Sequence, residues 1–371
     1  MPDTPPPRGA IARLIGGRHA ELRQAARVMV GAGAAFVAYK LLGFEQGYWA
    51  VFTVVIVLQG SIGGTLGAAV DRLIGTVAGA VLGALALILA PPTTMGIALA
   101  LGVVTGITAL AAAVRPQLRV APVTAAIVLL SHVPGVSPER FALDRVLEIA
   151  LGGVIGVLTS LFVFPARSRG VVVARISSAL TQCAQLLHGA AEAFDGTGES
   201  PGAAAHAPLR KALIAIEAAM QDAERERQSR LGEHGIPPAV PRTLWRIRND
   251  IVHVTRGLED PLPEPVAQAF GPIAAGLLRA EAAYAERCRL ALGESRAVER
   301  GDAAERYAAF AAGVEALRQS QVTRGMDFAV VGRLFGLIFA LEQLHRNLND
   351  LADRIDEAAA APARRALFAR T

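Results

Sequence analysis

The sequence has few aromatic residues and few cysteines, and each shortage excludes a class of protein. Aromatic residues make up 5% of the 371 residues. Because no basic stripe has aromatic residues interleaved with it, nucleic-acid binding is not expected. The two cysteines, Cys183 and Cys288, lie far apart without metal-ligand spacing. A metal site is therefore not expected, and the cysteine content fits a reducing cytoplasm.

Catalytic motifs are also missing. No Ser-His-Asp pattern surrounds Ser61, Ser131 or Ser160, and the glycine-rich stretch 60–67 lacks the Lys-Ser/Thr pair of a phosphate-binding loop. We therefore expect neither an enzyme nor a cofactor, and transport energy would come from an ion gradient or from passive flow. The N-terminus is proline-rich and then basic, which does not fit a signal peptide.

Charge is absent over stretches long enough to cross a membrane. Charged residues make up 19% of the chain, yet residues 73–114 contain none. The run 73–90 would reach about 27 Å as a helix, close to the thickness of a bilayer core. A soluble core cannot easily hide two such runs in succession, so this part predicts a membrane protein.

The charge distribution divides the chain into three parts. We predict a basic cytoplasmic N-terminal segment (1–24), a transmembrane domain (25–166) and a cytoplasmic helical domain (167–371). No alternating strand pattern occurs, so the fold class is an all-α membrane protein. The six predicted transmembrane helices lie at about 25–42, 48–60, 73–90, 94–114, 120–133 and 145–164.

Arginine and lysine in the short loops predict the orientation. The loops that share a side with the N-terminus contain more of these residues than the other loops, which contain Lys40, Arg140 and Arg145. The positive-inside rule therefore places both termini in the cytoplasm and explains the net charge of +5.

The membrane part contains an internal repeat. Residues 49–58 align with 120–129, with identities that include Ala50/Ala121 and Thr53/Thr124. Asp71-Arg72 then aligns with Asp144-Arg145, and the glycines that follow also match. Each copy has three spans, so the two copies would be inverted in the membrane, as in many transporters. Chance similarity between apolar segments is the alternative.

The second and fifth spans are short and interrupted. A stretch of six residues, 60–65, contains three glycines, and Pro122 lies in the fifth span. A matched pair of short, interrupted spans is the best sequence indication of a transport site. Glycines 75, 79 and 83, spaced for close helix packing, suggest a homodimer contact.

Several motifs resemble the fusaric acid resistance family, also called the aromatic acid exporters. They are Tyr48-Trp49 before the second span, Leu58-Gln59 after it, and Arg72-Leu73-Ile74-Gly75-Thr76. Segments 242–250 and 339–344 are similar to helices of the family's cytoplasmic domain. The fold is also similar to that of plant aluminium-activated malate channels, which are dimers. This resemblance implies organic-anion transport in a bacterial inner membrane.

Arg72 and Arg145 are the strongest candidates for substrate binding. Each is predicted to open a span, on opposite sides of the membrane, where a guanidinium would bind a carboxylate. The alternative is an interfacial arginine that pairs with the neighbouring Asp71 or Asp144, or with lipid headgroups.

Proton coupling would need a titratable group near the pathway. Glu148 lies one turn inside the sixth span, where Gly75 stands in the other repeat. Carboxylates within membranes usually mark a pathway, although a local pair with Arg145 is equally possible. His132 and Asp71 are the other candidates, and His132 is alternatively a solvated loop residue.

Aromatic and neutral polar groups complete the predicted substrate site. Tyr48 and Trp49 would stack on an aromatic substrate or anchor the chain at the membrane interface. The polar residues near the interruptions would contact substrate or satisfy freed backbone groups. They are Gln59, Ser61, Thr65, Thr76 and Thr124.

The sequence therefore predicts a secondary exporter of small organic acids, with aromatic carboxylates as the expected substrates, coupled to the proton gradient. A passive organic-anion channel and a membrane-anchored scaffold are the alternatives. The expected partners are the organic anion, the lipid bilayer, a second copy of the chain and a periplasmic adaptor protein.

Overall fold

Every regular element in the described part of the chain is a helix. The computed structural model describes residues 19–131, 136–229, 231 and 236–368. Within these ranges there is no strand, in agreement with the sequence pattern. The chain divides into two compact units, Met1–Ser168 and Arg169–Thr371. This division lies close to the predicted domain boundary, but the placement of the second unit in the cytoplasm stays a prediction.

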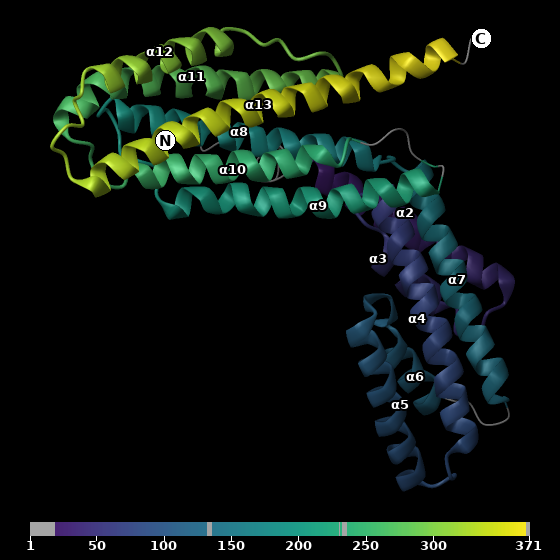
Figure 1. Ribbon diagram of the computed structural model, residues 1–371. Coiled ribbons are helices and arrows are strands. Elements are labelled where there is room, and N and C mark those ends of the chain that lie inside the picture. The colour runs from purple at the N-terminus through teal and green to yellow at the C-terminus, as the bar shows by residue number, and fades with distance from the viewer. Residues whose placement is uncertain (1–18, 132–135, 230, 232–235, 369–371) are drawn as a thin grey trace, which may run out of the picture. The chain divides into compact units, whose positions relative to one another are not determined.

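In chain order the helices of the first unit form two successive groups of three, which can be followed by their labels in Figure 1. The first group contains α2 (His19–Leu42), α3 (Tyr48–Val57) and α4 (Ile62–Leu89). The second group contains α5 (Thr94–Val114), α6 (Ala121–Leu130) and α7 (Pro138–Phe162), with a short 3-10 helix, η1 (Pro116–Leu118), before α6.

Four of these helices, α2, α4, α5 and α7, are long and apolar enough to cross a membrane. The other two, α3 and α6, have only 10 residues each. They reach about 15 Å, roughly half of a bilayer core. The two spans are therefore short, as expected, and the predicted bounds 48–60 and 120–133 extend beyond the helices. Two further helices of sufficient length and apolarity, α8 (Ser168–Phe194) and α13 (Phe328–Phe368), bring the candidates in the described residues to six.

Serine caps start α4 and α7 earlier than predicted. The Ser61 side chain accepts a hydrogen bond from the Gly64 amide at 3.0 Å, and Ser137 accepts one from the Arg140 amide at 3.3 Å. Such caps satisfy an amide that has no partner within the helix. Arg72 and Arg145 consequently lie inside their helices, and the prediction that each opens a span is wrong.

The third helix of each group packs closely on the second helix of the other group. A Cβ atom added at Gly79 of α4 would collide with the Ala121 carbonyl and lie 2.8 Å from the Thr124 Cβ atom. A Cβ atom at Gly152 of α7 would collide with the Ala50 carbonyl and lie 2.7 Å from the Thr53 Cβ atom. The absence of a side chain at these two glycines allows the backbones to approach.

Helices α4 and α7 run antiparallel to each other. The Ile62 amide at the start of α4 donates to the Ala166 carbonyl, just beyond the end of α7, at 3.2 Å. Further along, a Cβ atom at Gly153 would lie 3.7 Å from the Ala69 Cβ atom. Antiparallel third helices and matched glycine contacts support the inverted repeat, which nevertheless stays a prediction.

The glycines on α4 are used within the chain. Gly75 faces the Gln117 carbonyl, Gly79 faces Ala121, and Gly83 faces Ala125 and Val128. The face that we expected to meet a second copy is therefore covered by α6. The homodimer stays a prediction, and it needs a different surface.

The second unit is a helical bundle with its own hydrophobic core. It contains α8, α9 (Ala207–Gln228), α10 (Ala239–Gly257), α11 (Glu264–Glu294), α12 (Ala303–Gln319) and α13. The apolar faces of α8 and α13 lie in this core, where Ile176, Leu180 and Leu348 are fully buried. Core packing thus provides a second explanation for the apolar composition of both helices.

We expect Gly79→Val and Gly152→Val each to destabilise the first unit by about 1–3 kcal/mol, because an added side chain overpacks the helix crossing. The fraction of detergent-solubilised protein that stays monodisperse after heating would measure the effect. Gly102→Val is the matched control, since a Cβ atom there meets no other atom within 4 Å. Equal heat resistance in all three variants would contradict the role of these contacts.

Candidate functional site

The chain is interrupted between α3 and α4, and nearby polar side chains satisfy the interrupted backbone. The Gln59 amide donates to the Thr65 hydroxyl at 3.0 Å, and that hydroxyl donates to the Ser61 carbonyl at 2.9 Å. The Gln59 side-chain amide donates to the Ile56 carbonyl at 3.2 Å. Of the two roles considered for these three residues, backbone satisfaction therefore has direct geometric support.

Helix α2 contributes two further donors to the same interruption. The Gln24 side-chain amide donates to the Leu58 carbonyl at 3.0 Å, and the Arg27 guanidinium donates to the Gln59 carbonyl at 3.5 Å. Arg27 is only 4% exposed. A cation is stabilised there because the carbonyl end of a helix carries partial negative charge.

Arg72 is buried next to a neutral partner. Its Nε atom donates to the Thr53 hydroxyl of α3 at 3.1 Å. Arg72 is 8% exposed and Thr53 is fully buried. Among the residues that the structure describes, no carboxylate pairs with Arg72. The adjacent Asp71 is half-buried, and consecutive residues on a helix do not face each other.

Arg145 lies in a more crowded environment. Its guanidinium forms an ion pair with Glu148 at 3.2 Å and donates to the side-chain carbonyl of Gln46 at 2.7 Å. It also lies over the rings of Trp49, 4.6 Å from the centroid, and Phe141, 5.5 Å from the centroid. The residue is thus held by charge, a hydrogen bond and cation–π contacts.

A cavity of about 580 Å³ adjoins Arg145 and Glu148. Its lining includes further charged residues, namely Glu45, Arg140 and Asp144. The Arg145–Glu148 ion pair therefore forms part of the wall of a polar cavity.

Three buried polar atoms at or beside Arg72 and Arg145 have no hydrogen-bond partner within the described ranges. They are Trp49 Nε1, Thr76 Oγ1 and Arg145 Nε. Unpartnered buried donors and acceptors are costly, so they favour a site that contacts a polar ligand.

Two other predicted site residues are placed by the structure. Thr124 packs against Gly79, and Tyr48 is 45% exposed.

The structure brings some of the predicted site residues together and separates others. Gln59, Ser61 and Thr65 form the interruption, Arg72 pairs with Thr53, and Arg145 pairs with Glu148 and Trp49. His132 lies outside the described residues. No group of three His, Cys, Asp or Glu side chains that could hold a metal ion occurs in the part searched.

Sequence reasoning missed Gln46, Thr53 and Arg27 as site residues. A signal for Gln46 was present, because the alignment of 49–58 with 120–129 extends back to pair Gln46 with Gln117. No comparable signal marked Arg27, which belongs to an arginine-rich segment.

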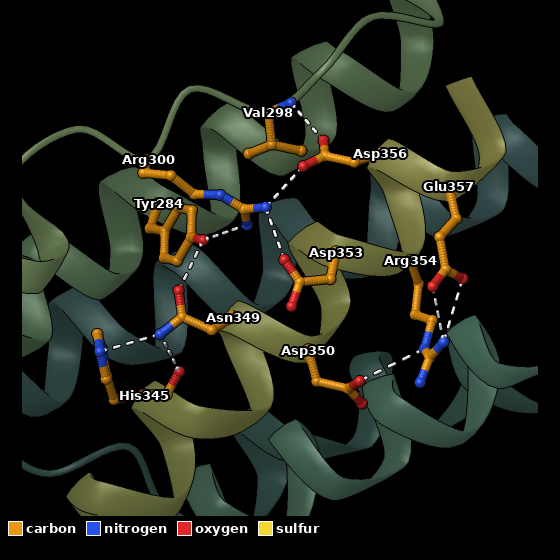
Figure 2. Close-up of polar contacts among 10 residues, drawn as sticks. All are labelled: Tyr284, Val298, Arg300, His345, Asn349, Asp350, Asp353, Arg354, Asp356 and Glu357. Atoms are coloured by element: carbon orange, nitrogen blue, oxygen red, sulfur yellow. Dashed lines mark hydrogen bonds and ion pairs between the residues drawn. The ribbon is translucent and has the colours of Figure 1, made fainter. Parts of the chain in front are cut away.

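The second unit contains an extended polar network of its own (Figure 2). The Tyr284 hydroxyl donates to the Asn349 side chain at 2.9 Å and accepts from Arg300 at 2.8 Å. Arg300 also pairs with Asp353 at 2.7 Å and Asp356 at 2.6 Å. These contacts join α11 and α13 through the segment that precedes α12.

A buried acid lies at the inner end of this network. Glu281 is fully buried, and its carboxylate lies 2.6 Å from the Nδ1 atom of His345. Tyr307 stacks on the His345 ring with a centroid distance of 4.1 Å. Burial raises the pKa of Glu281 above its ordinary value, while the hydrogen bond with His345 opposes this increase.

The apolar helices define the class of protein, which is a multi-pass helical membrane protein. Arg72 and Arg145 are buried among these helices. Residues 33–159 match the model of the family described as fusaric acid resistance protein-like. The resemblance is thereby confirmed over these residues, and it indicates membrane transport or efflux. The match begins within α2 and ends within α7, so the resemblance of the second unit stays a prediction. No curated protein matches the chain significantly.

We expect Glu281→Gln to remove part of the pH dependence of stability in the second unit. A raised pKa in the folded state stabilises that state below the unfolded pKa of about 4.3, and this contribution is lost as pH rises through the folded value. The wild type should therefore lose stability on going from acidic to neutral pH, and the variant should lose less.

A thiol-reactive fluorescent dye in a thermal ramp would measure this effect. Both cysteines, Cys183 and Cys288, lie in the core of the second unit and become reactive when it unfolds. Burial raises the pKa of the Cys288 thiol to about 12, which keeps it inert in the folded state. Glu342→Gln, on the surface of α13, is the control. Parallel pH profiles for wild type and Glu281→Gln would contradict the assignment.

Proposed function

We propose that this chain is a secondary transporter that exports small organic acids, with aromatic carboxylates as the substrate class. The observation that carries the proposal is the buried guanidinium of Arg72, whose one hydrogen-bond partner in the described residues is the neutral Thr53 hydroxyl. A carboxylate substrate would provide both the counter-charge and the acceptor geometry.

The surroundings of Arg72 support this proposal. A charged side chain among apolar membrane helices is costly and usually marks a substrate or ion pathway. Arg72 lies on α4 at its contact with α3, and α3 spans about half of the bilayer core. Short helices of this kind lie at the binding site in several transporter folds.

Coupling to the proton gradient is proposed to use Glu148. The residue is 2% exposed, pairs with Arg145, and lines the polar cavity. Protonation of Glu148 would break an ion pair within the membrane unit and alter the charge that the cavity presents. Asp71 is half-buried and is a weaker candidate for the same role.

The remaining predictions become parts of the same proposal. The chain would lie in a bacterial inner membrane with both termini in the cytoplasm. It would assemble as a homodimer through a surface other than the glycine face of α4, and it would work with a periplasmic adaptor. The buried arginines favour transport over a pure scaffold. A passive anion channel remains the second candidate, because the cavity at Arg145 is polar.

We expect Arg72→Ala to reduce organic-acid flux by about a hundredfold, since loss of one partner from a buried charged contact costs about 2–5 kcal/mol. Arg72→Lys should restore flux only partly, because an ammonium lacks the planar fork of a guanidinium. Uptake of labelled benzoate by proteoliposomes would measure the effect, with Arg119→Ala, an exposed arginine, as the control. Wild-type flux in Arg72→Ala would contradict the assigned role of Arg72.

We expect Glu148→Gln to abolish flux driven by a pH gradient while benzoate exchange at equal pH continues. Glutamine keeps the size and hydrogen bonding of glutamate but does not titrate. Parallel assays with and without a pH gradient would separate the two processes, and Glu139→Gln, exposed in the first turn of α7, is the matched control. Unchanged gradient dependence would make Glu148 a structural partner of Arg145 and favour the channel.

A further inference from the structure

The two repeat-equivalent arginines differ in whether the chain itself supplies a counter-charge. Arg145 has Glu148 at 3.2 Å, and both side chains are 3% exposed. Arg72 has the Thr53 hydroxyl at 3.1 Å and no paired carboxylate in the described residues. One arginine is therefore neutralised by its own helix, and the other is not.

A single position explains this difference. Glu148 follows Arg145 by three residues, which places the two side chains on the same face of α7. The residue three positions after Arg72 is Gly75, which faces the Gln117 carbonyl and has no side chain to offer. The asymmetry is thus part of the sequence and does not depend on side-chain rotamers.

The buried charge of the first unit can be counted from the described residues. Four charged side chains are buried in this unit, namely Arg27, Arg72, Arg145 and Glu148. Arg145 and Glu148 cancel. Arg27 donates to the Gln59 carbonyl near the end of α3, where backbone dipoles offset its charge. Arg72 remains as the one buried cation that has neither a carboxylate nor a helix end beside it.

We infer that the site selects monocarboxylates over dicarboxylates. Arg72 provides one uncompensated positive charge, whereas the positive charge of Arg145 is already neutralised by Glu148. This inference rests on the proposed function and specifies its substrate class. A monocarboxylate neutralises Arg72 completely. A dicarboxylate brings a second negative charge into a buried site where Arg145 is already paired, and an unpaired buried charge is strongly disfavoured.

The same argument assigns Glu148 a role in specificity. With Glu148 present, its carboxylate holds the Arg145 guanidinium. When its charge is removed, Arg145 becomes a second uncompensated cation. Conversely, a glutamate at position 75 would give Arg72 an internal partner of the kind that Arg145 has, and the substrate would have to compete with it.

Phthalate and its monomethyl ester provide a matched pair of probes. The two molecules share the ring and the ortho substitution, but at a pH where every carboxyl group is ionised the ester carries one charge and phthalate carries two. Both would be titrated into the purified full-length protein in lipid nanodiscs, and the ratio of their dissociation constants would be compared among variants.

We expect the wild type to bind the monoester at least about tenfold more tightly than phthalate, as one uncompensated charge would cause. Glu148→Gln should bring this ratio close to one or reverse it, and Arg72→Ala should lose binding of both molecules. Gly75→Glu should weaken binding of the monoester. Glu139→Gln should keep the wild-type ratio.

Several results would overturn the inference. These are a wild type that binds phthalate as tightly as the monoester, a Glu148→Gln variant with the wild-type ratio, or retention of binding in Arg72→Ala. In each of these cases carboxylate binding itself survives, so the proposed function stands. A folded wild type that binds neither molecule would overturn the proposed function together with the inference. Because Gly75 has little free space, Glu148→Gln is the deciding variant. The fraction of detergent-solubilised protein that stays monodisperse after heating, compared with the wild type, would confirm that it folds.

Discussion

The interruption of the chain between α3 and α4 imposes the constraint on which the rest of the first unit depends. A backbone that leaves its helix within a membrane has amides and carbonyls that water cannot satisfy. Here Ser61 at the N-cap of α4 and Thr65 in its first turn bond to the backbone, and Gln24 and Arg27 bond to it from α2. These contacts fix α2, α3 and the start of α4 relative to one another, and they allow α3 to end after about half of a membrane span.

Small residues then determine where the two halves of the unit meet. Gly79 and Gly152 bring α4 against α6 and α7 against α3, so that each half is completed by a helix of the other half. This exchange places Arg145 of the second half beside Gln46 and Trp49 of the first. The arginine environment is therefore a product of the helix crossing, and it would not form from either half alone.

Much of this arrangement could be predicted from the sequence, and the failures have physical causes. Uncharged runs identified the membrane helices, and the bounds of α5 were predicted to the residue. The starts of α4 and α7 were predicted too late because Arg72 and Arg145 were expected to open their spans, whereas Ser61 and Ser137 cap these helices earlier. The local pair of Arg145 with Glu148 was predictable from their spacing. The contacts of Arg27 and Gln46 were not, because they join segments that are distant in the chain.

The pairing of Arg145 with Glu148 on one helix has an electrical consequence. A rearrangement that moved this part of α7 across the membrane field would carry both charges together, so the transmembrane voltage would do no net work on the ion pair. Movement of α4 would likewise carry Arg72 together with the adjacent Asp71, so the empty helix would carry no net charge. A bound monoanion would add one negative charge, for which 100 mV corresponds to about 2.3 kcal/mol. Voltage would then act on the loaded protein and leave the empty one unaffected, so that a membrane potential would bias the step that carries substrate rather than the return step.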